Sequence, residues 1–190
     1  MNGHPQAIAT DSFIDRLKVC GFYPVRAETV EILQLNITRR CNLSCKHCHV
    51  QAGPSRTEMM SRETVAHCLH AAGHEGVSTI DITGGAPELH PDIEGLVHAM
   101  AGLGKRLIVR SNLVVLLEPA HRHLMELFAA NKVELVGSLP DYRAERSDRQ
   151  RGAGTFKQAI EAIRELNRNG YGRSDGSLKL DLVHNPAGAY

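Results

Sequence analysis

The fold of this chain is decided at residues 32–48, which read ILQLNITRRCNLSCKHC. The first part of this stretch, Ile32–Thr38, alternates apolar and polar residues, and a period of two predicts a β-strand. The second part places Cys41, Cys45 and Cys48 soon after that strand, with the spacing C-x3-C-x2-C. Three cysteines within eight residues favour metal ligation over packing, because thiolates are soft ligands suited to iron–sulfur clusters, copper(I) and zinc.

Outward from this stretch, strand patterns alternate with helical patterns along the whole chain. Further strands are predicted at residues 79–83, 107–112, 133–138 and 178–184. Apolar stripes of helical period fall at residues 61–72, 91–101, 119–128 and 155–169. Ser61 and Thr155 are expected N-caps, and Pro119 is the expected start of the third helix. This alternation predicts βα crossovers and a parallel sheet.

The predicted strands have one apolar and one polar face, unlike the continuous apolar strands of a doubly covered sheet. The polar face carries Gln34, Asn36, Asp81, Thr83, Asn112 and Ser138. We therefore expect an α/β fold, a partial (β/α) barrel of TIM type with a polar ligand at the carboxyl ends of its strands. A closed barrel takes roughly 250 residues, so this chain of 190 is expected to be truncated after about five strand–helix units.

Composition narrows the class of protein. A net charge of +1 and the absence of Trp give no sign of a nucleic-acid partner. No apolar run approaches the ~18–20 residues that span a bilayer, and residues 1–10 do not resemble a signal peptide. We expect a cytoplasmic protein without a membrane partner, in which residues 1–30 form an N-terminal extension and residues 31–190 form a core domain that is incomplete at its C-terminus.

The cysteine cluster allows several interpretations. A 4Fe-4S cube on three cysteines keeps one iron open for a substrate or cofactor, and Arg39 and Arg40 would partly offset its negative charge. Zinc with His47 or His49 as fourth ligand is an alternative, although zinc ligands usually come in two separated pairs. Residues 45–49 also match the C-x-x-C-H pattern of haem attachment, which requires export. A metal-free loop of reduced cysteines is the remaining alternative.

With the aromatic ring of His47 directly before its third cysteine, the motif resembles the signature of the radical S-adenosylmethionine (SAM) superfamily. The resemblance implies an enzyme with a 4Fe-4S cluster on Cys41, Cys45 and Cys48, whose open iron is chelated by SAM. It implies reductive cleavage of SAM to methionine and a 5′-deoxyadenosyl radical, with the cofactor carrying the hard chemistry. It also implies an electron donor such as a flavodoxin or ferredoxin.

Residues at other strand ends extend this resemblance. Paired glycines such as Gly84 and Gly85 allow close backbone approach to a ligand, or simply form a turn. The segment resembles the superfamily's Gly-Gly-Glu-Pro motif, which binds the methionine amino group, with Ala86 in place of Glu. Residues 148–155 resemble the loop that enters the superfamily's fourth helix. The implied cofactor-binding residues are His47, Gly84, Gly85, Ala86, Ser111, Asn112 and Ser138.

A narrower resemblance is to the arsenosugar biosynthesis radical SAM proteins. It rests on the sequence segments LQLN (33–36), CHV (48–50), AGPSRTEM (52–59), DITGGAPEL (81–89) and NPAG (185–188). It implies a small-molecule substrate, a trivalent dimethylated arsenic compound that accepts the deoxyadenosyl group.

This chain departs from the subgroup at two positions. The subgroup tends to carry Cys where Ser111 and Asp141 stand, and neither residue replaces a thiol as a soft ligand for arsenic(III). A cysteine-bearing C-terminal region typical of the subgroup is not among these residues. The alternatives are a radical SAM enzyme with a different substrate, or a truncated or diverged cluster-binding module without turnover.

Overall fold

The computed structural model describes residues 12–26, 28–174, 176 and 178–185. The chain divides into two compact units, Met1–Val30 and Glu31–Tyr190. The first unit contains the short helix α1 (Phe13–Val19), which begins after Ser12, whose hydroxyl accepts a hydrogen bond from the Asp15 N–H at 3.2 Å. None of the residues of α1 is fully buried.

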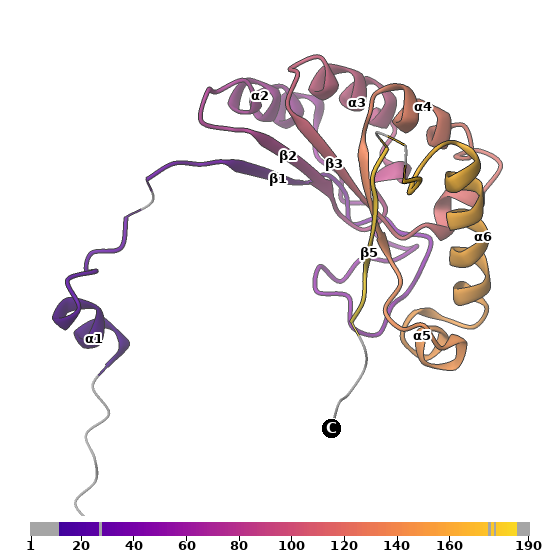
Figure 1. Ribbon diagram of the computed structural model, residues 1–190, viewed down its shortest axis with the longest axis horizontal. Helices are drawn as coiled ribbons and strands as arrows, with labels where there is room; N and C mark the ends of the chain where they lie inside the picture. Colours follow the sequence, from indigo (N-terminus) through magenta and orange to yellow (C-terminus); the bar gives the residue numbers. More distant parts are fainter. Residues whose placement is uncertain (1–11, 27, 175, 177, 186–190) are drawn as a thin grey trace, which may run out of the picture. The chain divides into compact units, whose positions relative to one another are not determined.

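The second unit is built on a five-stranded parallel sheet whose strands follow one another in chain order (Figure 1). The strands are β1 (Ile32–Asn36), β2 (Thr79–Thr83), β3 (Arg106–Ser111), β4 (Glu134–Ser138) and β5 (Leu180–Val183). Each strand pairs in parallel with its neighbour in the chain. The structure confirms the predicted α/β fold, and this strand order is that of a partial TIM-like barrel.

Helices cover one face of the sheet, as Figure 1 shows. They are α2 (Arg62–Ala72), α3 (Ile93–Ala101), α4 (Leu124–Ala130) and α6 (Thr155–Arg168), while α5 (Ala144–Arg151) follows β4. The core includes Ile80, Ile82 and Val109 of the sheet and Phe128 of α4, all fully buried. None of the helices in the described part of the chain is long and apolar enough to cross a membrane.

The opposite face of the sheet carries a polar network around one buried carboxylate. Asp81 is 3% exposed and accepts hydrogen bonds from Gln34 Nε2 at 2.8 Å and from Arg110 Nε and Nη2 at 2.8–3.0 Å. Gln34 and Asp81 are register partners on β1 and β2. A buried charge is tolerated only when it is paired and hydrogen-bonded, and these contacts meet that requirement for Asp81. The same contacts link the three strands that carry the residues.

Two of the expected helix starts are wrong. The third helix begins at Leu124 rather than at Pro119, because Val114–Leu117, whose first three residues are buried, form a 3-10 turn (η2) and the chain then turns again before it becomes α-helical. The N-cap of α6 is Gly154 in a left-handed conformation (φ 79°), and Thr155 is already helical.

The cap of α6 comes from a residue that the sequence analysis placed in a loop. Asp148 accepts hydrogen bonds from the N–H groups of Gly154 and Phe156, both at 2.8 Å. Residues 148–151 are the last turn of α5 rather than a loop. The carboxylate of one helix therefore caps the next. By contrast, the predicted N-cap Ser61 is confirmed by its hydrogen bond from the Thr64 N–H.

Candidate functional site

A cavity of 280 Å³ opens at the carboxyl ends of the strands, where the segments that follow β1, β2, β3 and β4 meet. It brings together residues that are far apart in the sequence, as expected for parallel strands that end at one edge of a sheet. Eight of the predicted site residues line it: Cys41, Cys45, Cys48, Gly84, Gly85, Ser111, Asn112 and Ser138.

The cysteine loop is anchored at its base by backbone hydrogen bonds. The Cys41 N–H donates to Gly53 O, and the Gly53 N–H donates to Arg39 O, each at 3.1 Å. Within the loop, the Cys48 N–H donates to Cys45 O at 3.3 Å. Cys41 is buried, and Cys45 and Cys48 are half-buried. All three thiols therefore reach the cavity from one compact loop.

Two of the three sulfur atoms accept hydrogen bonds. Cys41 Sγ accepts from the Leu43 N–H at 3.4 Å and from Asn112 Nδ2 at 3.5 Å, and Cys48 Sγ accepts from the Ala52 N–H at 3.3 Å. Burial raises the pKa of the Cys41 thiol; the two hydrogen bonds to its sulfur oppose this, and the neighbouring Cys45 and Cys48 add to it. Donors aimed at sulfur stabilise the thiolate, which is the form that ligates metal.

Three thiolates at one cavity are a donor set that an iron–sulfur cluster uses. Within the described ranges, no group of three or more His, Cys, Asp or Glu side chains converges closely enough to hold one metal ion. A zinc site would need four ligands within about 2.0–2.3 Å of one point. A 4Fe-4S cube spreads its thiolate ligands over different irons, and three thiolates leave one iron open. The cavity beside the thiols gives room for a ligand of that iron.

The paired glycines are required where the chain after β2 crosses the cysteine loop. The Gly85 N–H donates to Thr38 O at 2.7 Å. A Cβ atom would lie 2.5 Å from Thr38 O if added to Gly84, and 2.4 Å from Arg40 O if added to Gly85. Real Cβ atoms essentially never approach within 3.0 Å of such atoms. Any side chain here would push away the backbone that leads directly into Cys41.

The two serines of the predicted site come from the ends of neighbouring strands. Ser111 is the last residue of β3 and is 1% exposed, and its Oγ accepts a hydrogen bond from the Leu113 N–H at 2.9 Å. Ser138 ends β4 and is half-buried. Both serines line the cavity, and a hydroxyl can act there as a hydrogen-bond donor or acceptor.

A buried cation at the cavity was missed by the sequence patterns. Arg151, the last residue of α5, is 7% exposed and lines the cavity. Its guanidinium donates to the backbone carbonyls of Ser138 and Asn112, the latter at 3.1 Å. No carboxylate of the described residues lies within 4 Å of it to form an ion pair. The Arg151 guanidinium therefore brings a positive charge to the cavity that the thiols line, where it can attract an anionic ligand.

His47 and Ala86 lie outside the lining of this cavity. His47 is exposed and lines an adjoining cavity of 190 Å³, which shares Cys45, Ser138 and Arg151 with the first. Ala86 is fully buried, and its N–H donates to Arg40 O at 2.9 Å. His47 therefore faces the adjoining cavity rather than the one that contains the thiols. Ala86 instead supports the cysteine loop through its backbone hydrogen bond to Arg40.

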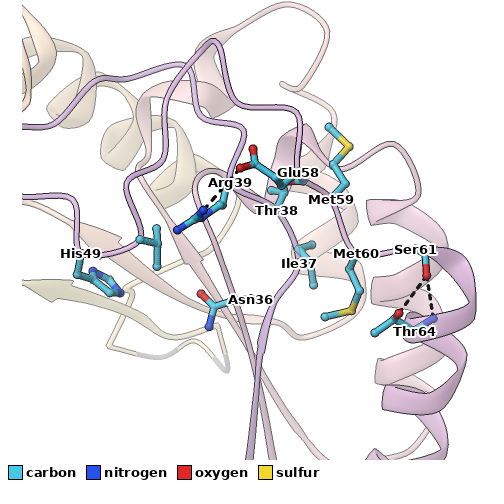
Figure 2. Close-up of a pocket in the computed structure, with 11 residues that line it drawn as sticks. Asn36, Ile37, Thr38, Arg39, His49, Glu58, Met59, Met60, Ser61 and Thr64 are labelled. Atoms are coloured by element: carbon cyan, nitrogen blue, oxygen red, sulfur yellow. Dashed lines mark hydrogen bonds and ion pairs between the residues drawn. The ribbon is translucent and has the colours of Figure 1, made fainter.

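A larger groove of 620 Å³ runs beside the carboxyl end of β1 (Figure 2). Its wall includes Asn36, the Arg39–Glu58 ion pair and Met59. His49 and its neighbour Val50 line both this groove and the cavity that contains the thiols. The groove therefore borders the thiol-lined cavity and offers space for a second ligand next to it.

Comparison with known proteins gives the family of the chain. The family model described as Radical SAM superfamily matches residues 35–182. Among curated proteins, the chain is 31% identical over 175 residues to a GTP 3′,8-cyclase of Synechococcus, covering 81% of this chain and 48% of that protein. It is 28% identical to an AdoMet-dependent heme synthase of Oleidesulfovibrio alaskensis, covering 73% of this chain and 36% of that protein. It is also 28% identical to the antilisterial bacteriocin subtilosin biosynthesis protein AlbA of Bacillus subtilis, covering 70% of this chain and 30% of that protein.

Solved structures share the fold at low sequence identity. SuiB of Streptococcus suis, solved with bound S-adenosylmethionine, is 16% identical with a TM-score of 0.65, covering 92% of this chain and 44% of that one. The AdoMet-bound anSMEcpe is 15% identical with a TM-score of 0.61, covering 80% and 43%. The chain spans less than half the length of these relatives. Enzymes of this family use a 4Fe-4S cluster and SAM. On its sequence match over most of its length, the chain belongs to the radical SAM superfamily.

Proposed function

We propose that this chain is the cofactor-binding part of a radical SAM enzyme, in which Cys41, Cys45 and Cys48 hold a 4Fe-4S cluster. The observation that carries the proposal is the convergence of these three thiols with Gly84, Gly85 and a buried cation on one cavity. When bound and reduced, the cluster supplies the electron that cleaves SAM to methionine and a 5′-deoxyadenosyl radical. The residues of the chain bind and orient the cofactor and limit the access of water.

The lining residues have distinct roles in this proposal. The backbone at Gly84–Gly85 lies against the amino group of the methionine moiety. Arg151 pairs with the methionine carboxylate, because it is a buried guanidinium that lines the cavity, without a carboxylate partner in the described chain. Ser111 and Ser138 donate to the carboxylate or ribose. His47 lies beside the adenosine end, in the adjoining cavity that shares Ser138 with the first.

The substrate that we propose is a trivalent methylated arsenic compound. Support comes from the sequence segments that this chain shares with the arsenosugar biosynthesis subgroup, including the Ala-Pro that follows the two glycines. The groove bordered by His49 and Met59 provides a place for a substrate next to the cofactor. Addition of the 5′ carbon radical to arsenic(III) in dimethylarsinous acid forms a carbon–arsenic bond and leaves one unpaired electron on arsenic. Transfer of that electron to a one-electron acceptor, which the oxidised cluster would supply, and loss of the hydroxyl proton to water would give the pentavalent arsenic product.

The two positions at which the subgroup tends to carry Cys are both buried. Ser111 lines the cavity at 1% exposure, and Asp141, also 1% exposed, accepts a hydrogen bond from the Arg143 N–H at 2.9 Å and does not line it. Binding of arsenic in this proposal therefore does not use thiolates at these positions. The electron donor is a flavodoxin or ferredoxin of the cytoplasm, where thiols stay reduced.

The substrate proposal is tested with the anaerobically reconstituted chain, SAM, a chemical reductant and dimethylarsinous acid. We expect mass spectrometry to detect an adduct of deoxyadenosine and dimethylated arsenic. Formation of free 5′-deoxyadenosine without any arsenic adduct would refute the substrate and leave the cofactor chemistry standing. Absence of both products would indicate a cluster-binding module without turnover.

Replacement of Arg151 tests the orientation of SAM. Arg151→Gln should weaken SAM binding roughly 10- to 100-fold, because a hydrogen bond to a charged group contributes about 1.5–3 kcal/mol. Calorimetry with the cluster-loaded protein measures the affinity. Arg149→Gln is the matched control, because this residue lies in the same helix but is exposed.

The contribution of the SAM carboxylate to binding can be measured separately by repeating the titration with decarboxylated SAM. Because that ligand has no carboxylate, its affinity should be equal for the parent protein and for Arg151→Gln. An equal loss for both ligands would instead show that Arg151 only supports the backbone of β3 and β4.

A further inference from the structure

The N–H donors of the Asn112 side-chain amide are used within the protein itself. Its Nδ2 donates to Asn42 Oδ1 at 2.7 Å and to Cys41 Sγ at 3.5 Å, while its Oδ1 accepts from the Val115 N–H at 3.0 Å. A primary amide has two N–H donors. Both are therefore used, and none remains for the ribose or carboxylate of SAM, although the residue lines the cavity.

Asn42 and Glu118 hold this amide in place. Asn42 lies between the first two cysteines, and its Nδ2 donates to Glu118 Oε1 at 2.7 Å. The Glu118 carboxylate thus orients Asn42 with its oxygen toward Asn112, and Asn112 in turn presents an N–H to the sulfur. These three side chains form one chain of hydrogen bonds that ends on Cys41, and each of the three bonds joins residues 70–76 positions apart in the sequence.

Cys41 is distinguished from the other two cysteines by this contact. Its sulfur accepts one backbone and one side-chain donor, while the Cys48 sulfur accepts a backbone donor. The 7% exposure of Asn112 and 6% exposure of Cys41 shield the side-chain bond from water. Hydrogen bonds to ligand sulfurs are among the features that set the reduction potential of iron–sulfur clusters.

We infer that Asn112 is a positioning residue for the cluster rather than a ligand of SAM, and that the Glu118–Asn42–Asn112 chain raises the reduction potential of the cluster through Cys41. Reduction adds negative charge to the cluster and its thiolates. An N–H donor on sulfur stabilises the reduced form more than the oxidised form. The inference rests on the proposed function, since it requires a cluster on Cys41.

The experiment measures the midpoint potential of the anaerobically reconstituted cluster by an EPR-monitored redox titration. Asn112→Ala should shift the potential to a more negative value, so that the reduced-to-oxidised ratio at a fixed potential falls about tenfold, equivalent to about 59 mV for one electron. Asn42→Ala should shift it in the same direction by less. Asn131→Ala is the control, because Asn131 also makes a 2.8 Å side-chain bond but precedes β4, at the other end of the sheet.

The double variant tests whether the two residues act together. Because Asn42 acts through Asn112, the double variant should have the potential of Asn112→Ala alone. Calorimetry should give unchanged SAM affinity in Asn42→Ala. If the Asn112→Ala variant fails to retain its cluster, the Asn42→Ala variant provides the test instead. It keeps the Asn112 amide, so its reduction potential still shows whether the chain of hydrogen bonds acts on the cluster.

Two results would overturn the inference. Unchanged potentials combined with lost SAM affinity in Asn112→Ala would make Asn112 a cofactor ligand. Unchanged potentials with unchanged affinity would make the chain of hydrogen bonds inert. If the parent chain itself assembles no cluster, the proposed function fails; if it assembles one whose potential the variants do not move, this inference alone fails.

Discussion

Iron binding is expected to be lost when any one of Cys41, Cys45 and Cys48 is replaced by alanine. Three thiolates are the fewest protein ligands that leave a cube with a single open iron, so removal of one exposes a second iron to water. The three residues reach one cavity from one loop, and no other cysteine in the described part of the second unit lines it. Iron and acid-labile sulfide analysis after anaerobic reconstitution checks this expectation.

The two remaining cysteines are the matched controls. Cys20 is exposed in the first unit, and Cys68 lies on α2, half-buried against the core with its thiol 3.9 Å from Met60 Sδ. Cys20→Ala and Cys68→Ala should keep the full iron content. If Cys68→Ala lost as much iron as Cys48→Ala, the assignment of the three ligands would be wrong.

Gly85→Ala is expected to disrupt the site although it adds a single methyl group. The new Cβ would lie 2.4 Å from Arg40 O and 2.9 Å from Ala52 Cβ, so the cysteine loop must move. Both the cluster content and the SAM affinity should fall severely, because the displaced backbone carries Cys41. Measurements of iron content and of SAM binding on the same preparation test the two consequences together.

Gly95→Ala supplies the comparison for this variant. Gly95 lies in α3, and an added Cβ there would meet nothing within 4 Å. Helix propensity favours alanine over glycine at such a position, so this variant should be at least as stable as the parent and bind as much iron. Normal iron and SAM binding by Gly85→Ala would show that the glycine contact with the cysteine loop is unimportant.

The sheet could be predicted because its signal is local. Alternating side chains mark each strand within a few residues, and parallel strands must end at one edge. The meeting of Cys41, Gly85 and Ser138 at one cavity follows from that geometry alone. The helix α5 could not be predicted in this way, because its sequence AERSDRQR has no apolar stripe.

The hydrogen-bond partners of the site residues could not be predicted from the sequence. The bond from Asn112 to Cys41 joins residues 71 positions apart, and the bond from Arg151 to Asn112 spans 39 positions. A pattern identifies a polar residue at a strand end but does not say which atoms its donors meet. For the same reason the sequence did not reveal that Gly85 packs tightly against the chain beside Cys41.

The most direct test of the central claim is the formation of 5′-deoxyadenosine. The chain is reconstituted anaerobically with iron and sulfide, reduced with dithionite and incubated with SAM, and the products are quantified by chromatography and mass spectrometry. We predict equal amounts of 5′-deoxyadenosine and methionine, formed by the parent chain and absent with Cys45→Ala. A parent chain that carries a reducible 4Fe-4S cluster and binds SAM, yet forms no more 5′-deoxyadenosine than Cys45→Ala, would contradict the proposed function.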